Sequence, residues 1–308
     1  MRRRLSILLP AALAVTLLAA PGCIAFNEEC SSPPDLVDPD TIIGYLAAPI
    51  PVTENRVRTE EMAIGNLVAD AFADAFNNPA NPNHRDTVSP VDGAIENAGG
   101  IRNEGFCAEV DSLPGDPDDP PPLTRADLRE VMPFTNRVVV VELNAAEVIE
   151  IFEHSVSALG DPDDPDKGFF LQVSEGMEVI VDCTGTPQEV VEGAITVPGT
   201  RVQAIRFGDR VPCAVQADCP AGNVCDTGRS ACKIDPADTT TLYRVATNDY
   251  LLRADGNDGF ATLAGRPGFN SLGRLDVEAV EDYLDLHSSP VLPYEPRVEG
   301  RLVLDNCD

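Results

Sequence analysis

The spacing of apolar and polar positions predicts helices separated by short strands. Apolar residues recur at helical intervals from Thr59 to Phe76, and Asn77-Asn-Pro79 ends that helix. Arg58 stands just before it, so we expect this side chain to project from the helix entrance. Three further helices are predicted, each opened by a capping residue: Thr124 through Val131, Asn144 through Leu159 and Asp276 through Leu286.

Short apolar runs predict the strands. Arg137–Leu143 holds four consecutive valines, as is typical of a strand buried on both faces. The other candidate strands are 92–96, 169–173, 177–182, 201–207, 242–247 and 297–304. This order of elements is compatible with several folds that combine helices and sheets, and it does not by itself distinguish between them.

The N-terminus carries the features of an export signal. Three arginines precede an apolar run, Leu5–Ala20, that is too short for a spanning helix, so residues 1–22 are predicted to be a signal peptide. The following Ala20-Pro-Gly-Cys23 resembles the lipobox of bacterial lipoproteins, which makes Cys23 the candidate for lipidation. Plain secretion, with cleavage before Cys23, is the alternative. We expect a protein of the bacterial cell envelope, periplasmic or on the outer membrane and held to the membrane by its N-terminal lipid.

The cysteines suit an oxidising compartment. Of the nine, Cys23 is set aside, and the remaining eight suit four disulfides whose pairing is left open. Four of them, Cys213, Cys219, Cys225 and Cys232, are spaced six, six and seven residues apart. Structural zinc sites usually pair cysteines two to four residues apart. The spacing therefore predicts a disulfide-stapled insert at about 208–238 and no metal site.

Charge narrows the classes of partner. The net charge of −29 argues against a nucleic-acid partner, because an acidic surface repels phosphate backbones. Two loops, 115–120 and 160–165, share the hexapeptide Gly-Asp-Pro-Asp-Asp-Pro. Their prolines and the lack of a glutamate at loop spacing favour solvated loops over calcium sites. Residues 23–55, rich in Pro, Asp and Ser, are predicted to be a tether or an edge segment.

One stretch combines turn residues with candidate binding groups. After the short strand 92–96 come Asn97, Gly99, Gly100 and Arg102. Paired glycines allow a tight bend and close approach of another group, and the amide and guanidinium flank that bare backbone. Alone, this pattern indicates an ordinary turn as readily as a binding site.

Four stretches in this order resemble one family. They are Arg58 with Gly65–Asp70, Asn97–Arg102, Met132–Asn136, and Tyr243–Tyr250 with Gly256–Gly259. Together they resemble the C-terminal domain of 5′-nucleotidases and related periplasmic nucleotide hydrolases, over about residues 56–305. The resemblance implies one α+β domain at 56–308 in which helices are layered on mixed β-sheets, in an α/β/β/α-like arrangement.

The resemblance also implies a nucleoside-binding role for particular residues. Phe134 and Tyr250 would sandwich the base, since flat rings stack at little conformational cost. The remaining polar groups would surround it: Asn97 and Asn136 at the base edges, Asp258 at the ribose hydroxyls, and Arg58 and Arg102 on the ribose and phosphate side. For each ring, packing in the core is the competing interpretation.

Departures from the family pattern concern one loop above all. Ala98 replaces the first glycine of an Asn-Gly-Gly-Gly-Ile-Arg run. Asn257 stands where a second glycine is expected before Asp258, and the loop from Tyr250 to Asp258 is two residues longer. The position of Asp258 is therefore the least determined.

Catalysis in this family belongs to a separate N-terminal metallophosphatase domain with two metal ions. Such a site needs several converging ligands, and the three histidines here, His84, His154 and His287, are scattered. We read His154 as a helix-surface or satisfied core histidine. The chain alone is expected not to hydrolyse phosphate esters and to hold no cofactor, with a metal pair only in a partner. The leading hypothesis is a nucleoside- or nucleotide-binding domain working with a separate metallophosphatase. A non-catalytic nucleoside receptor and a structural envelope protein are the alternatives.

Overall fold

The computed structural model of the protein describes residues 36–82, 84, 89–103, 109–161, 168–269 and 273–307. The predicted signal peptide, Cys23, Cys30, Cys107 and most of the second acidic loop lie outside these residues. Within the described ranges, no helix is long and apolar enough to cross a membrane.

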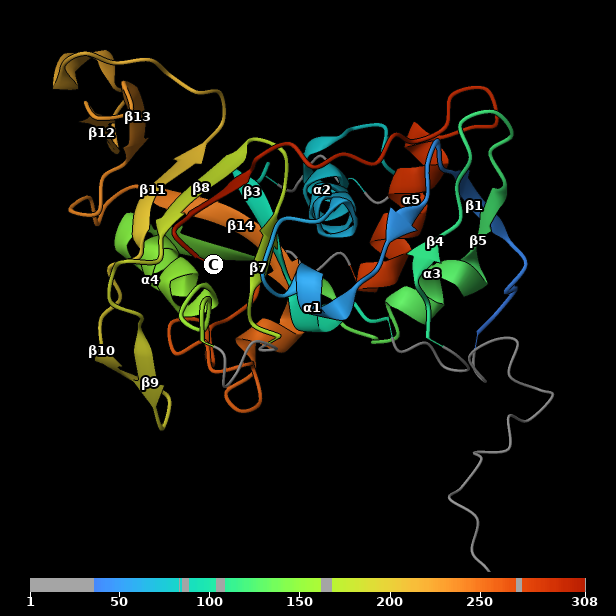
Figure 1. Ribbon diagram of the computed structural model, residues 1–308, viewed down its shortest axis with the longest axis horizontal. Coiled ribbons are helices and arrows are strands. Elements are labelled where there is room, and N and C mark those ends of the chain that lie inside the picture. The colour runs from blue at the N-terminus through green and yellow to red at the C-terminus, as the bar shows by residue number, and fades with distance from the viewer. Residues whose placement is uncertain are drawn as a thin grey trace, which may run out of the picture.

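A four-stranded mixed sheet forms the centre of the molecule (Figure 1). Its strands, in spatial order, are β6 (Val138–Asn144), β14 (Leu242–Asn248), β3 (Gly93–Asn97) and β7 (Leu171–Val173). β14 pairs antiparallel with β6 and parallel with β3, and β3 pairs antiparallel with β7. The four valines that open β6 are all buried, as predicted from the uninterrupted apolar run.

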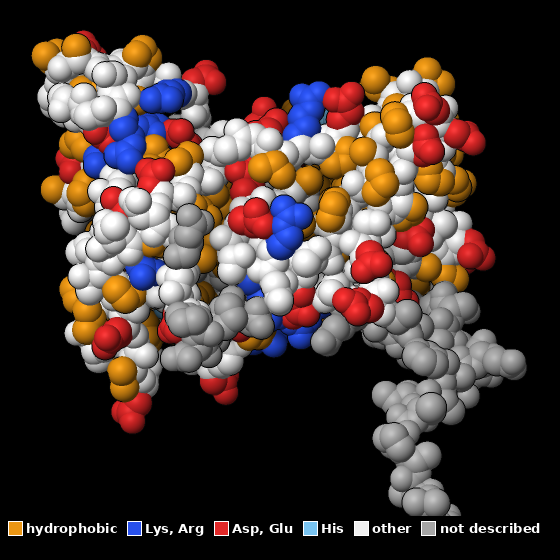
Figure 2. All heavy atoms as spheres, in the orientation of Figure 1, with side chains coloured by type: hydrophobic (Ala, Val, Ile, Leu, Met, Phe, Trp, Pro, Cys, Tyr) orange, Lys and Arg blue, Asp and Glu red, His pale blue; other side chains and the backbone are white. Residues whose placement is uncertain are grey.

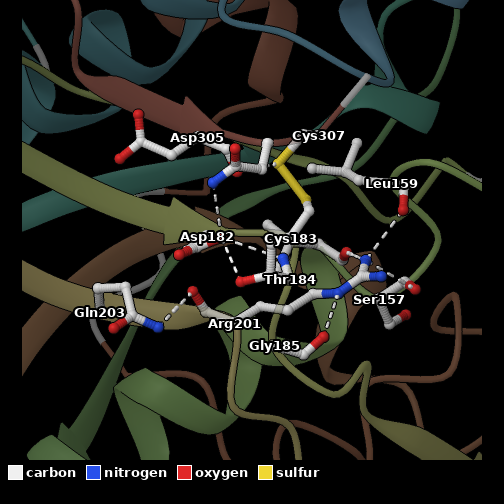
Figure 3. The surroundings of a disulfide bond; sticks show 12 residues. Ser157, Leu159, Asp182, Cys183, Thr184, Gly185, Arg201, Gln203, Asp305 and Cys307 are labelled. Carbon is white, nitrogen blue, oxygen red and sulfur yellow. Dashed lines mark hydrogen bonds between the residues drawn. A yellow bond between two sulfur atoms is a disulfide. The ribbon is translucent and has the colours of Figure 1, made fainter.

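A second, three-stranded mixed sheet lies beside the first. β8 (Met177–Asp182) pairs antiparallel with β11 (Val202–Phe207) and parallel with β15 (Leu302–Asp305). β15 is therefore an edge strand, and it is shorter than the strand predicted at 297–304. A disulfide between Cys183 and Cys307 joins the chain just beyond β8 to the chain just beyond β15 (Figure 3).

The helices pack on these sheets. α2 (Ala63–Asn77) packs against β3 and β7 and also against α5 (Asp276–His287), while α4 (Ala145–Ser155) packs against β6 and β11. Their apolar faces join one continuous core that includes Phe72, Phe152 and Leu284. The fold is thus a single α+β domain with helices on mixed sheets, as expected.

Two of the helix caps predicted from the sequence are present. Thr124 opens α3 (Arg125–Val131) in a capping box with Asp127, and Asn144 opens α4 in the same way with Glu147. The cap predicted for α5 was wrong by one residue. Leu275 is the N-cap, and its backbone N–H donates to the Glu278 carboxylate, whereas Asp276 is buried in the first turn.

The predicted bounds of two helices were also wrong. The helix expected from Thr59 begins only at Ala63, and Arg58 instead closes a separate short helix, α1 (Glu54–Val57). α4 ends at Ser155 rather than Leu159. Beyond its end, the chain is held by Arg201, whose Nη1 donates to the carbonyls of Val156, Ser157 and Leu159 (Figure 3).

The segment predicted as a tether or edge is an edge from residue 42 onward. β1 (Ile42–Tyr45) pairs with β5 (Pro122–Thr124), and β2 (Ile50–Pro51) pairs with β4 (Ser112–Leu113). Ile43, Leu46 and Ile50 are buried in the core. Residues 42–55 are therefore part of the folded domain.

The cysteine-rich insert projects from one end of the molecule (Figure 1). It contains the hairpin of β12 (Asn223–Asp226) and β13 (Ala231–Ile234), and its disulfides join Cys213 to Cys225 and Cys219 to Cys232. The predicted disulfide staple is thereby confirmed. A second hairpin, β9 (Glu189–Val191) with β10 (Ala194–Val197), precedes it in the chain. Acidic side chains are spread over the face seen in Figure 2, with Lys and Arg in a few small groups among them.

Candidate functional site

A cavity of about 460 Å³ is lined by residues from separate parts of the chain. All nine residues predicted from the sequence lie in its wall: Arg58, Asn97, Gly99, Gly100, Arg102, Phe134, Asn136, Tyr250 and Asp258. Thr135, Gly168 and Arg253 complete the wall. The volume falls in the range of about 300–1,000 Å³ that is usual for small-molecule sites.

Both aromatic rings line the cavity. Phe134 is 42% exposed, and Tyr250 is half-buried. An arginine lies over each ring: Arg102 Cζ is 5.8 Å from the Phe134 centroid, and Arg253 Cζ is 5.2 Å from the Tyr250 centroid. A cation at this distance is attracted to the negative face of the ring. Core packing, the competing interpretation, does not describe Phe134, whereas Tyr250 both packs against the hydrophobic core and lines the cavity.

The Asp258 carboxylate is held from two sides. Its Oδ1 accepts a 2.7 Å hydrogen bond from the Tyr250 hydroxyl, and its Oδ2 accepts one of 2.9 Å from Asn97 Nδ2. Burial, reinforced by the hydrogen bond and charge of Asp258, raises the pKa of Tyr250 to about 12. The phenol therefore stays protonated and keeps donating.

Contacts within and behind the loop from Tyr250 to Asp258 fix the position of Asp258. Asp258 has a left-handed backbone, with φ of 57°, and its carbonyl lies 2.9 Å from His154 Nε2. Asn257, which replaces a glycine of the family pattern, is buried and donates to the carbonyls of Leu251 and Phe260. His154 is a buried histidine at the back of this loop, which agrees with the core alternative predicted for it.

A buried polar network orients Asn97 at the end of β3. Asn248 Nδ2 donates 2.8 Å hydrogen bonds to both Glu96 Oε2 and Asn97 Oδ1. With its oxygen so engaged, the Asn97 amide must turn its nitrogen toward Asp258. Burial raises the pKa of Glu96 well above its usual value. A Cβ at Gly100 would collide with Glu96 Oε1, which explains a glycine there.

Gln172 on strand β7 holds the turn in which Arg58 lies. Gln172, fully buried on β7, donates to the carbonyls of Val57 and Glu60 and accepts from the Met62 N–H. These bonds hold the turn between α1 and α2. A Cβ at Gly65 would overlap the Gln172 side chain, so this glycine makes room for the link.

The side chain of Asn136 lies between the carboxyl of Asp276 and the guanidinium of Arg253. Its side chain hydrogen-bonds the Asp276 carboxyl, and its Oδ1 lies 3.4 Å from Arg253 Nη2. Burial is the main cause that raises the pKa of Asp276 to about 7, against the opposing effects of its hydrogen bonds. The amide thus presents its oxygen toward the cavity.

Sequence reasoning missed four residues at or behind the cavity wall. Arg253 lies in the loop that the sequence analysis expected to be longer than in the family, and that expectation was its available signal. Nothing in the sequence signalled the close pairing of Gly168 with Gly99, whose N–H donates to the Gly168 carbonyl at 2.8 Å. Thr135 lies between two predicted residues. Glu54, four residues before Arg58, fell in the segment expected to be a tether.

Potential metal ligands are not gathered at this cavity within the described ranges. There, three cysteines of the insert, Cys213, Cys219 and Cys232, have sulfur atoms near one another, and all three form disulfides. The cavity offers instead two ring faces, two amides, one carboxylate and three guanidinium groups.

Comparison with known proteins identifies the family. Residues 42–265 match the family model described as 5′-nucleotidase, C-terminal domain. The chain is 29% identical over 247 residues to 5′-nucleotidase of Homo sapiens, covering 80% of this chain and 34% of that protein. It is 26% identical over 245 residues to apyrase of Aedes aegypti, covering 80% and 33%.

A solved structure shows the same fold. The 5′-nucleotidase precursor from Thermus thermophilus superposes with a TM-score of 0.56 and 24% identity, over 86% of this chain and 40% of that one. The chain spans about a third of the length of the 5′-nucleotidase and the apyrase named above. On the strength of the matched residues, it belongs to the family of 5′-nucleotidase C-terminal domains.

Proposed function

We propose that this domain binds a nucleoside or nucleotide in the cavity between Phe134 and Tyr250. The observation that carries the proposal is the convergence of nine residues, drawn from four separate stretches of sequence, on one cavity. Family membership supports it, since the relatives named above are a 5′-nucleotidase and an apyrase.

In the proposed complex the two rings stack on the base. Stacking on flat side chains costs little conformational entropy and accepts any base. The amides of Asn97 and Asn136 meet polar edges of the ligand. Asp258, held by Tyr250 and Asn97, keeps lone pairs for ribose hydroxyls, because each carboxylate oxygen can accept more than one hydrogen bond.

We further propose that hydrolysis belongs to a separately encoded metallophosphatase, which would hold the divalent metal pair. Two-metal hydrolysis needs several ligands within a few ångströms of each other. Among the residues that the structure describes, the cavity wall supplies recognition groups, with Asp258 as its carboxylate. The proposed setting is the bacterial cell envelope, with the chain exported by residues 1–22 and anchored through lipid on Cys23.

Isothermal titration calorimetry tests the binding function. Parent protein should bind one or more of adenosine, AMP and a UDP-sugar, and Phe134→Ala should weaken that binding about tenfold or more, as loss of a stacking face costs about 1–3 kcal/mol. Phe269→Ala is the matched control, since Phe269 is 46% exposed and lies outside the cavity wall. Failure of the parent protein to bind any of the three would refute the proposal.

The partner is tested by adding this protein to a purified envelope metallophosphatase from the same cell. A rise in nucleotidase activity that Phe134→Ala abolishes supports the split enzyme, and unchanged activity contradicts it. A nucleoside receptor without catalysis is the second candidate, favoured by the fact that this chain supplies both ring faces itself. Tight nucleoside binding without any effect on the metallophosphatase would select it over both the split enzyme and an idle structural protein.

A further inference from the structure

Glu54 links the two arginines on one wall of the cavity. It lies in the first turn of α1, and its Oε1 accepts from Arg58 Nη2 and, at 3.1 Å, from Arg102 Nη1. The side chains of Glu54, Arg58 and Arg102 are 16%, 12% and 30% exposed respectively. Both arginines line the cavity, whereas Glu54 lies behind them.

Two arginines share one carboxylate in this trio. Both Arg58 and Arg102 donate to Glu54 Oε1, on the side of the cavity that the proposed function assigns to ribose and phosphate. Charge pairs shielded from water interact more strongly than exposed ones, so Glu54 influences an anion that approaches the same N–H groups. An arriving phosphate both competes with Glu54 for donors and is repelled by it.

We propose that Glu54 is a specificity-determining residue, which limits the gain in affinity that each added phosphate gives over the nucleoside. This inference rests on the proposed nucleotide-binding function. It treats Glu54 as acting through Arg58 and Arg102, without contact to the ligand. Arg102 also lies over the Phe134 ring, so Glu54 has a positioning effect as well.

A ratio of affinities separates the two effects. Loosening Arg102 would weaken binding of a nucleoside and its phosphates through Phe134, and it would also cost the phosphates an ordered donor, so it leaves the ratio of phosphate affinity to nucleoside affinity unchanged or lowers it. Removing the negative charge of Glu54 would strengthen only the phosphorylated ligands. A rise in the affinity for ADP divided by the affinity for adenosine therefore reports the charge effect.

The experiment measures this ratio by calorimetry for the parent, Glu54→Gln, Glu54→Asp and Glu60→Gln. Glu54→Gln should raise the ratio about tenfold, and Glu54→Asp, which keeps the charge, should stay within about threefold of the parent. Glu60→Gln is the matched control: Glu60 is paired with the exposed Arg56 in the same region and lies outside the cavity wall. The gain should shrink in about 0.5 M salt, because salt screens the charge.

The possible outcomes distinguish a failure of this inference from a failure of the proposed nucleotide-binding function. An unchanged ratio in Glu54→Gln, or an equal rise in Glu60→Gln, would overturn the role of Glu54 while leaving nucleoside binding intact. Absence of binding by the parent protein would remove both. Should Glu54→Gln fail to fold by circular dichroism, Glu54→Ser removes the same charge with a smaller side chain and must give the same rise.

Discussion

The hydroxyl of Tyr250 donates a 2.7 Å hydrogen bond to the carboxylate of Asp258, eight residues further along the same loop. One end of this loop thus carries a ring of the proposed base sandwich, and the other carries the proposed acceptor for the ribose. The bond fixes the spacing between them before any ligand arrives. Preorganisation of this kind reduces the entropy that binding would otherwise cost.

Replacing Tyr250 by phenylalanine should therefore weaken binding without removing the stacking face. We expect Tyr250→Phe to lower nucleoside affinity about threefold to tenfold, because a typical hydrogen bond contributes about 0.5–1.5 kcal/mol. Calorimetry with the best-bound ligand is the measurement. Tyr243→Phe is the control, because the Tyr243 hydroxyl donates to the Gly222 carbonyl and the residue lies outside the cavity wall. Equal losses in both variants would contradict the prediction.

The second prediction concerns the network beneath the cavity. Asn248 is fully buried and supplies the hydrogen bonds that orient Asn97 and satisfy Glu96 Oε2. Asn248→Ala should lower the free energy of unfolding by about 2–4 kcal/mol, because it leaves two buried polar groups without a donor. Urea denaturation measures it.

Asn223→Ala provides the comparison for this variant. Asn223 lies in the cysteine-rich insert, where its side chain makes only a long, 3.4 Å bond to the Ala221 carbonyl among the bonds described. Its loss should change stability by less than about 0.5 kcal/mol. If Asn223→Ala lowered the free energy of unfolding as much as Asn248→Ala, the buried network would not contribute more to stability than an ordinary surface contact.

The sequence predicted the residues of the cavity wall better than the contacts that hold them in place. Arg58, Phe134, Tyr250 and Asp258 were found because short ordered motifs carry the family resemblance. Their mutual placement depends on contacts between residues far apart in sequence, such as Gln172 with the α1–α2 turn, for which no local pattern exists. Capping boxes were predictable because both partners lie within three residues.

The errors have the same physical origin. The apolar period from Thr59 continued smoothly, yet the Gln172 side chain takes the backbone groups that an extra helical turn would have used. Likewise, Arg201 donates to the carbonyls of Val156 and Leu159 and so holds the chain after Ser155 through a contact that no local pattern signals. Tertiary hydrogen bonds override local periodicity in both cases.

Asp276 gives a prediction about pH. Its pKa is raised to about 7 in the folded protein, from 3.8 in the unfolded chain. At a pH between these two values, the folded state therefore holds a proton that the unfolded state has lost. Stability from this residue is therefore present in acid and declines as pH rises toward 7. Between about pH 5 and pH 8 the parent should lose about 2–3 kcal/mol relative to Asp276→Asn.

Asparagine is the appropriate comparison, since its side-chain oxygen can still accept from the Val277 N–H but cannot ionise. Urea denaturation of both proteins at several pH values gives the difference, in which other titrating groups largely cancel. Parallel curves for the two proteins would mean that the Asp276 carboxyl is ionised throughout, and a difference of the opposite sign would mean that its charge stabilises the fold.

Arg253 provides the last prediction, because its guanidinium reaches from the Tyr250 ring to Asn136 Oδ1 and so connects the two segments that carry the rings. Arg253→Met keeps the length and the apolar stem but removes the charge and the donors. We expect it to weaken nucleoside binding about threefold to tenfold, from the loss of one cation–π contact and one hydrogen bond. Arg137→Met is the matched control, since Arg137 is exposed, bonds the Gly273 carbonyl and lies outside the cavity wall. Tighter binding by Arg253→Met would show instead that the guanidinium covers the ring face that the base requires.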